Sequence, residues 1–208
     1  MDSLGIIIVS WNVRELLSRC LTTLQQALSQ SQVKATVWVV DNASADNSAT
    51  MVRENYPWVY LEALDENLGY VRGNNLVLKR MLRGDMPDLV WLLNPDTEVR
   101  PDAITALQQH FAQSPQAGLA GPKLLNPDGT LQNSAFRFPG LLQPLFDLGW
   151  LPNRFYGTRL NGRYAQQQYA SAKAFRVDHP LGAAMMARGA AITDVGPLDE
   201  HFFMYCEE

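Results

Sequence analysis

Several features are scarce in this sequence, and each scarcity excludes a class of protein. Cys20 and Cys206 are the two cysteines among 208 residues, which is too few for a disulfide framework or a zinc cluster and suits a reducing cytosol. No apolar run approaches the roughly 18 residues that cross a bilayer. The short apolar run Leu4 to Val9 lacks the basic start of a signal peptide. We therefore expect a cytoplasmic chain.

The chain also has no excess of positive charge. It contains 17 Lys and Arg against 21 Asp and Glu, a formal net charge of −4. A protein that binds nucleic acid over a broad face is normally basic, so we expect no nucleic-acid partner. Within this acidic total, residues 137–176 hold six basic residues and one acidic residue. This basic segment could therefore still bind an anionic partner.

The glycine-rich loops that bind phosphate are missing. There is no G-x-x-x-x-G-K-S/T loop and no G-x-G-x-x-G after the first apolar run, which argues against a P-loop NTPase and a dinucleotide-binding domain. Residues 10–14 are also not the G-x-G-T-R-like loop expected of a nucleotidyltransferase. The phosphates of a bound nucleotide would need another partner, such as a metal ion held by carboxylates.

Regular alternation of strand and helix patterns fills the first half of the chain. A length of 208 residues allows one domain, and 47% hydrophobic residues can bury a core. Alternation of this kind predicts an α/β fold with a mostly parallel sheet and helices on both faces. The predicted strands are Leu4–Ser10, Ala35–Val40, Trp58–Ala63 and Leu89–Leu93. The predicted helices are Val13–Leu28, a short helix capped by Asp46 that ends before Tyr56, Gly69–Arg83 and Pro101–Gln113.

The second half predicts a smaller region of strands and loops. Leu119–Leu125 and Thr130–Phe138 are typical of two strands around a turn at residues 126–129. His179–Ala187 predicts another strand, and a short helix is expected from Gly189. Between them, residues 137–176 show no clear periodicity.

Polar side chains follow the predicted parallel strands where each one ends. Ligands of parallel α/β sheets bind beyond the carboxyl ends of the strands, so these residues are candidate ligand contacts. They are Ser10-Trp11-Asn12, Asp41-Asn42, residues 65–67 and Asn94-Pro95-Asp96.

Asp41 and Asp96 each have two interpretations. Asp96 follows a buried strand and could bind a hard divalent cation together with diphosphate oxygens, or it could cap the Asn-Pro-Asp turn. Asp41 could accept a hydrogen bond from a base or ribose, or it could cap the loop that follows it.

Two further segments also have two interpretations each. The glycines and asparagines of residues 67–75 permit close approach of a ligand to a helix start, or tight packing there. Glu207 and Glu208 could supply a general base, because a partly apolar cleft raises the pKa of a carboxylate towards neutrality. Alternatively, they form a solvated chain end.

These segments, in their order and spacing, resemble the family-two glycosyltransferases of bacteria, and within them the rhamnosyltransferase-like branch of surface-polysaccharide synthesis. The resemblance covers nearly the whole chain. The residues that carry it are Ser10-Trp11-Asn12, residues 40–44, residues 67–70 and 73–75, Leu93-Asn94-Pro95-Asp96, residues 121–125 and 127–130, and residues 195–200 and 202–205.

The resemblance implies a GT-A fold and an inverting transfer from a nucleoside-diphosphate sugar, dTDP-rhamnose or a UDP-sugar, to a glycan or lipid-linked acceptor. Mn²⁺ or Mg²⁺ is the implied cofactor. Residues 1–208 would be one domain, with a nucleotide-sugar half at about 1–116 and an acceptor half at about 117–208.

The resemblance also implies roles for individual residues. Asp96 would bind the metal, and Glu207-Glu208 falls on the family's acid pair, either of which could be the base. The nucleotide pocket would be lined by Trp11, Asn12, Asp41, Gly69, Arg72 and Asn75. The donor-sugar pocket would be formed by Asn94, Gly182, Ala183 and Ala184.

Some features depart from the family pattern. Asn94-Pro95-Asp96 has one carboxylate fewer than the usual metal motif, Arg72 replaces a small residue, and Glu208 replaces an aspartate. The family pattern continues beyond this motif, so we expect a chain truncated at Glu208, which could be an inactive fragment. The alternative function is a nucleotide-sugar-binding or scaffolding domain without turnover.

Residues 137–176 are the expected acceptor side. Their basic and aromatic residues could form a mobile loop that faces an anionic, lipid-linked acceptor at a membrane surface. An ordinary solvated insertion is the alternative. Under the first interpretation, the cytoplasmic protein would lie at the inner face of the cell membrane.

Overall fold

The chain folds into two compact units. The computed structural model describes residues 2–138, 162–171 and 173–201. One unit comprises residues 1–120 and 182–208, and the other comprises residues 121–181. The expected division into a donor half and an acceptor half concerns ligand binding, and it stays a prediction.

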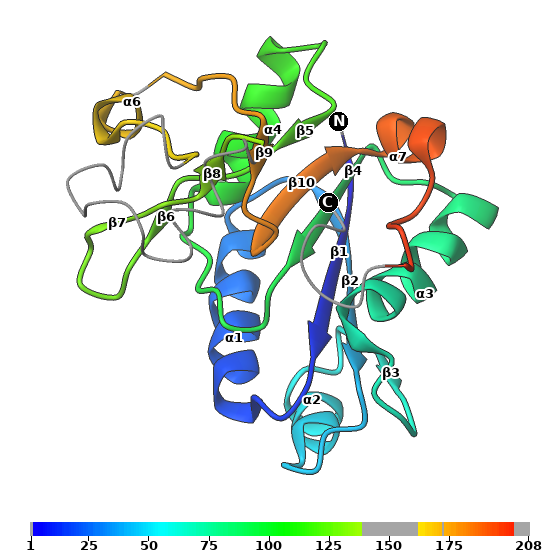
Figure 1. Cartoon of the computed structure of the whole chain (residues 1–208). Coiled ribbons are helices and arrows are strands. Elements are labelled where there is room, and N and C mark those ends of the chain that lie inside the picture. Colours follow the sequence, from blue (N-terminus) through cyan, green and yellow to red (C-terminus); the bar gives the residue numbers. More distant parts are fainter. Residues whose placement is uncertain (1, 139–161, 172, 202–208) are drawn as a thin grey trace. The chain divides into compact units, whose positions relative to one another are not determined.

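The first unit contains a six-stranded sheet in the order β3-β2-β1-β4-β10-β5 (Figure 1). β1, β2, β3 and β4 run parallel, whereas β10 is antiparallel to both β4 and β5. The predicted mostly parallel sheet is therefore confirmed. The strand bounds are β1 Ser3–Ser10, β2 Lys34–Asp41, β3 Tyr60–Ala63, β4 Leu89–Leu93, β5 Leu119–Ala120 and β10 Ala184–Arg188.

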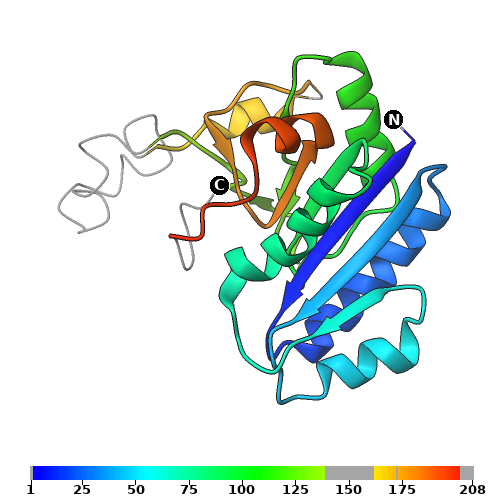
Figure 2. The same ribbon diagram turned by 90° about the vertical axis from the view of Figure 1, so that its right-hand side faces the viewer.

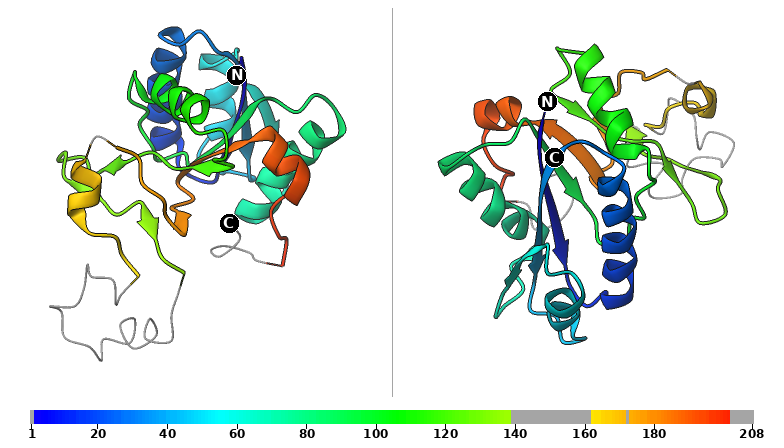
Figure 3. Two further views of the ribbon diagram at one scale, coloured as in Figure 1. Left: turned by 90° about the horizontal axis from the view of Figure 1, so that it is seen from above. Right: turned by 180° about the vertical axis from the view of Figure 1, so that it is seen from behind.

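Helices cover both faces of this sheet, as the sequence predicts. Figures 2 and 3 show α3 and α7 on one face, and α1 and α4 on the other. The helix bounds are α1 Arg14–Ser29, α2 Ser48–Asn55, α3 Gly69–Arg83, α4 Ala103–Gln113 and α7 Gly189–Val195.

The core of the first unit explains why its central strands are apolar on both faces. Ile7 and Val9 of β1 pack with Val77 and Leu78 of α3 in one buried cluster. The alternate residue, Ile8, is also fully buried, so β1 is covered on both sides. The central strand is thus held in place by apolar contacts on two faces.

The second unit contains two small antiparallel pairs. β6 (Leu124–Leu125) pairs with β7 (Leu131–Gln132) around the predicted turn, and β8 (Ala135–Phe136) pairs with β9 (His179–Pro180). A five-residue helix, α6 (Gln166–Ala170), places Tyr169 beside Ala135 and Tyr164 in a small aromatic core.

Three predicted strands of the second half are wrong in extent. Leu119–Leu125 divides into β5 and β6, Thr130–Phe138 into β7 and β8, and His179–Ala187 into β9 and β10. The first and third breaks coincide with the passage of the chain between the two units. A strand that leaves one sheet must stop pairing there, and a local apolar pattern does not record this.

None of the helices in residues 2–138, 162–171 and 173–201 is long and apolar enough to cross a bilayer.

Candidate active site

The polar strand ends meet at one edge of the sheet. β1 ends at Ser10, which is the register partner of Asp41 at the end of β2. β4 ends at Leu93, which pairs with Ala184 at the start of the antiparallel β10. The first residue of β10 therefore lies at the rim formed by the ends of the parallel strands, and residues 182–183 directly precede it.

Three buried oxygens at this rim have no hydrogen-bond partner among the described residues. They are the hydroxyl of Ser10 and the Oδ1 atoms of Asp41 and Asn42. The residues are only 1–2% exposed. A buried polar atom without a partner is costly, so native structures rarely leave one without a ligand or an ordered water.

The Asp41 carboxylate combines both interpretations suggested by the sequence. Its Oδ2 accepts a hydrogen bond from the Ser44 N–H at 3.0 Å, which caps the following loop. Its Oδ1 has no partner in the part of the chain that the structure describes. The capping oxygen fixes the carboxylate, and the other oxygen is available to a ligand.

Asn12 joins the loops after β1 and β2. Its backbone N–H donates to Ser44 Oγ at 2.9 Å, and its Oδ1 accepts from the Ala45 N–H at 2.8 Å. Asn12 has φ 53°, a left-handed conformation that asparagine tolerates better than most residues. The neighbouring Trp11 side chain is 54% exposed, so its ring is accessible at the rim.

The start of α3 is fixed to the same rim. Gly69 has φ 78°, and its N–H donates to Asn67 Oδ1 at 2.8 Å. The Asn42 amide donates to the Gly69 carbonyl at 3.1 Å. A Cβ atom on Gly73 would lie 2.9 Å from Val9 Cγ1, so glycine allows α3 to approach β1 closely. Arg72 is exposed beside this helix start.

The residues predicted for the donor sugar lie beside one another. The Asn94 N–H donates to the Ala183 carbonyl at 2.8 Å. The Tyr70 hydroxyl, from the first turn of α3, donates to the Gly182 carbonyl at 3.3 Å. Gly182 and Ala184 are buried. The structure thus joins β4, β10 and the start of α3 around these residues.

Asp96 is an exposed carboxylate in the turn after β4. It makes no hydrogen bond or ion pair with the residues described, and these contain no cluster of three potential metal ligands. Its neighbour Thr97 closes the turn by donating from Oγ1 to the Asn94 carbonyl at 2.7 Å. Mg²⁺ and similar cations are often held by one or two carboxylates and substrate phosphates, so a single free carboxylate fits such an ion.

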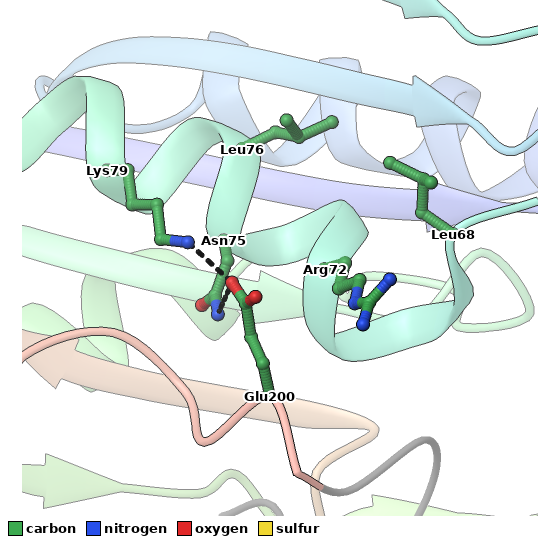
Figure 4. Close-up of a pocket in the computed structure, with 6 residues that line it drawn as sticks. All are labelled: Leu68, Arg72, Asn75, Leu76, Lys79 and Glu200. Carbon is green, nitrogen blue, oxygen red and sulfur yellow. Dashed lines mark hydrogen bonds and ion pairs between the residues drawn. The ribbon is translucent and has the colours of Figure 1, made fainter.

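Asn75 contacts a distant part of the chain. Its amide bonds the backbone of Leu198 and the carboxylate of Glu200, and Lys79 also donates to Glu200. The hydrogen bond from Lys79, followed by the one from Asn75, is the main reason that the pKa of Glu200 lies below its usual range. A pocket of about 280 Å³ lies at this junction. It is lined by the six residues drawn in Figure 4: Leu68, Arg72, Asn75, Leu76, Lys79 and Glu200.

Comparison with known families decides the class of the protein. The family described as "Glycosyl transferase family 2" matches residues 5–178. The chain belongs to glycosyl transferase family 2. The predicted enzyme class, a glycosyltransferase, is therefore confirmed.

A curated member of this enzyme class aligns with the whole chain. It is the N-acetylglucosaminyl-diphospho-decaprenol L-rhamnosyltransferase of Mycobacterium tuberculosis (strain CDC 1551 / Oshkosh). The two sequences are 28% identical over 218 residues, which covers 100% of this chain and 68% of the relative. The rhamnosyltransferase-like resemblance is confirmed.

Solved glycosyltransferase structures share the fold. S. aureus TarS 1-349 in complex with UDP has a TM-score of 0.60 at 16% identity, covering 100% of this chain and 52% of that one. The mannosyltransferase PcManGT from Pyrobaculum calidifontis, in complex with GDP-Man and Mn²⁺, has a TM-score of 0.58 at 16% identity, covering 95% and 47%. The predicted GT-A fold is confirmed, and the chain spans about half of each structure.

The predicted catalytic pair of this family-2 glycosyltransferase, Glu207 and Glu208, lies outside the described residues. Ser10 and Asn42 were among the candidate contacts at the strand ends, but nothing in the sequence indicated that their oxygens are buried without a partner among the described residues. Glu200 was not a candidate. The contact of Glu200 with Asn75 joins residues 125 positions apart, so no local pattern could reveal it.

Proposed function

We propose that the chain transfers a sugar from a nucleoside-diphosphate donor to a hydroxyl of a glycan or lipid-linked acceptor, with inversion at the anomeric carbon. The unpartnered buried oxygens of Ser10, Asp41 and Asn42 carry this proposal. The two Oδ1 atoms are acceptors and the hydroxyl can donate or accept, which suits the N–H and O–H groups of a nucleoside.

The donor fits along the rim in the proposed site. Trp11 would stack on the base, Asp41 would accept its hydrogen bond, and Asn12, Gly69 and Arg72 would complete the nucleotide pocket. The sugar would lie at Asn94 and residues 182–184. TarS, which shares the fold, binds UDP. The similarity to a rhamnosyltransferase supports dTDP-rhamnose as the donor and a UDP-sugar as the second choice.

A divalent cation, Mn²⁺ or Mg²⁺, fits the exposed Asp96 carboxylate. Such an ion neutralises charge on the leaving diphosphate. The presence of Mn²⁺ in PcManGT, which shares the fold, supports this cofactor. The residue of this chain that would hold it is Asp96, with the remaining ligands supplied by the donor.

The chemistry requires one proton acceptor from the protein. The acceptor hydroxyl oxygen attacks the anomeric carbon from the face opposite the diphosphate, its proton passes to a carboxylate, and the bond from carbon to the diphosphate oxygen breaks. The nucleoside diphosphate leaves with the electron pair of that bond. By resemblance, Glu208 or Glu207 takes the proton.

The acceptor half is proposed at about 117–208 and the donor half at about 1–116. The name of the mycobacterial relative specifies a decaprenol-linked acceptor, which supports a lipid-linked acceptor and a role in cell-surface polysaccharide synthesis. In residues 137–176, the described residues Lys173, Arg176 and Phe138 are exposed, which suits an anionic membrane surface. We place the reaction in the cytoplasm, at the inner face of the cell membrane.

A nucleotide-binding panel tests this function. UDP, dTDP and GDP are titrated calorimetrically with and without Mn²⁺, and we expect at least one to bind. Asp41→Asn keeps an oxygen for the Ser44 N–H but removes the second acceptor. It should weaken binding about 10- to 150-fold, since a hydrogen bond to a charged group contributes about 1.5–3 kcal/mol.

The matched control is Asp128→Asn, in the turn of the second unit, where the carboxylate bonds only Thr130 among the described residues. It should leave nucleotide affinity unchanged. A folded chain that binds none of the three nucleotides contradicts the proposal. Binding without donor hydrolysis or transfer favours the domain without turnover instead.

A further inference from the structure

Tyr70 connects the first turn of α3 to the chain that leads into β10. Its hydroxyl donates a hydrogen bond to the Gly182 carbonyl at 3.3 Å, which joins residues 112 positions apart. Gly182 is buried and lies two residues before β10 begins. The half-buried Tyr70 ring packs against the buried cluster that includes Val77 and Met185. The side chain is therefore held by apolar contacts at its ring and by a hydrogen bond at its hydroxyl.

The backbone of residues 182–183 is held by two elements. The Gly182 carbonyl accepts from Tyr70, and the next carbonyl, that of Ala183, accepts from the Asn94 N–H at 2.8 Å. Consecutive carbonyls are thus fixed by α3 and by the turn after β4. Ala183 itself is only half-buried, so this fixed segment is partly accessible to a ligand.

The first turn of α3, from which Tyr70 extends, is also fixed in place. The Asn74 Nδ2 donates to the Tyr70 carbonyl at 3.0 Å, and the Asn42 Nδ2 donates to the Gly69 carbonyl at 3.1 Å. The two asparagines are only 1–2% exposed, so water competes little for these bonds. Tyr70 therefore extends from a backbone that cannot easily move, and its hydroxyl can hold the Gly182 carbonyl in one position.

We propose that Tyr70 is a positioning residue that sets the affinity for the sugar of the donor. The proposed sugar site consists of Asn94 and residues 182–184, and Tyr70 fixes the carbonyl of the first residue in that segment. This inference rests on the proposed function and adds a residue to which the family resemblance assigned no role. The nucleotide contacts proposed at Trp11 and Asp41 involve other side chains. Tyr70 should therefore affect binding of the sugar and not binding of the nucleoside diphosphate.

The size of the effect follows from the single hydrogen bond that is lost. Removing the Tyr70 hydroxyl takes this donor from a buried carbonyl, so the backbone at Gly182 should move towards another donor or water. A sugar hydroxyl that bonds to this segment would then meet a displaced partner. The loss of about one neutral hydrogen bond corresponds to an affinity change of about 2- to 12-fold.

The experiment compares each nucleoside diphosphate with its own sugar nucleotide. The pairs are dTDP with dTDP-rhamnose, UDP with UDP-GlcNAc and GDP with GDP-Man, each titrated calorimetrically into the full chain with Mn²⁺. Tyr70→Phe keeps the ring and removes the hydroxyl. For the pair that binds, we expect the Kd of the sugar nucleotide to rise about 2- to 12-fold and that of the nucleoside diphosphate to change less than about twofold.

Tyr56→Phe is the matched control. The Tyr56 hydroxyl also connects two elements, because it donates to the Ser18 carbonyl of α1 at 2.9 Å and lies 2.9 Å from Thr22 Oγ1. None of these residues belongs to the proposed donor site. Tyr56 is 7% exposed, so Tyr56→Phe should lose at least as much stability in urea unfolding as Tyr70→Phe. It should nevertheless leave the ratio of the two Kd values at the wild-type value, whereas a purely structural role of Tyr70 would make the two variants alike.

The two Kd values separate this inference from the proposed function. If Tyr70→Phe raises both Kd values equally, Tyr70 supports the nucleotide site or the fold as a whole, and the role in sugar positioning is wrong. If neither Kd changes, that role is also wrong, while the proposed function stands. If the wild-type chain binds none of these compounds, the proposed function fails and this inference fails with it.

Discussion

At the scale of single residues, Cys20 is buried on α1 at 0% exposure. Its sulfur lies 3.7 Å from the Asn94 carbonyl and 3.9 Å from Thr97 Oγ1. Burial raises the pKa of this thiol to about 12. Since the thiolate is the reactive form, Cys20 should be inert in the folded protein at neutral pH.

This gives a test of the packing behind the turn after β4. In a Cys206→Ser variant, which leaves Cys20 as the single cysteine, we expect alkylation at pH 7.5 to be negligible in buffer and to reach the rate of a free cysteine across the urea unfolding transition. Rapid alkylation under native conditions would contradict the burial of Cys20.

The same scale shows which site residues a sequence can predict. Asp41 ends β2 and Asp96 lies three residues beyond the end of β4, so the strand ends place both at the same edge of the sheet. The contact of Asn75 with Leu198 could not be predicted, because it depends on how two segments more than 120 residues apart meet. The missing partners of Ser10 and Asn42 likewise depend on tertiary burial.

At the scale of elements, the corner between β10 and α7 rests against the segment before β4. The Gly189 N–H donates to the Asp88 carbonyl at 2.9 Å. A Cβ atom on Gly189 would lie 2.0 Å from the carbonyl oxygen of Pro87. That oxygen belongs to the backbone and cannot rotate away as a side chain could, so the corner requires glycine.

Gly189→Ala should therefore destabilise the fold by roughly 3 kcal/mol, at the upper end of overpacking effects. The control is Gly118→Ala, where the added Cβ would lie 3.5 Å from Ala191 Cβ, an ordinary contact. Urea unfolding of both variants measures the difference. Equal stability of Gly189→Ala and wild type would show that the corner can open without cost.

Elements could be predicted where the local signals agree with the tertiary structure. α3 and β4 have the predicted bounds, Gly69–Arg83 and Leu89–Leu93. Leu119–Leu125 was predicted as one strand and is two, because pairing ends where the chain enters the second unit. At that point a Cβ atom on Gly121 would lie 2.6 Å from Pro180 Cβ. No periodic pattern in the sequence signals such close packing between segments that are far apart in the chain.

At the scale of the whole molecule, the alternation of strands and helices was sufficient to predict a mostly parallel sheet with helices on both faces, whereas the GT-A fold was implied by the family resemblance. Parallel strands joined by helices have few allowed connections, so short-range patterns predict the type of sheet, while the strand order β3-β2-β1-β4 comes from the structure. The antiparallel strand β10 is different, because it inserts between β4 and β5 after the chain has passed through the second unit. Its place depends on contacts between distant segments of the chain.

The whole fold should also respond to acid through carboxylates that connect its segments. Asp88 joins the start of β4 to the start of β1, because its Oδ2 accepts from the N–H groups of Asp2 at 2.7 Å and Ser3 at 3.3 Å. The bond from Asp2 is the main reason that the pKa of Asp88 lies below its usual value. Burial alone would raise the pKa of Asp46, but hydrogen bonds from Ser48 and Arg14 outweigh it and lower that pKa.

A carboxylate whose pKa is lower in the folded state than in the unfolded state stabilises the fold above the unfolded pKa, which is about 4 for aspartate. This stabilisation is lost as pH falls through the folded pKa. The free energy of unfolding should therefore fall from pH 5 towards pH 2. Asp46→Asn and Asp88→Asn should each flatten this fall, and their curves should converge with wild type at the acid end, where the wild-type carboxylates are protonated. Urea titrations at each pH measure these curves, and variant curves parallel to wild type over the whole range would contradict the assignment.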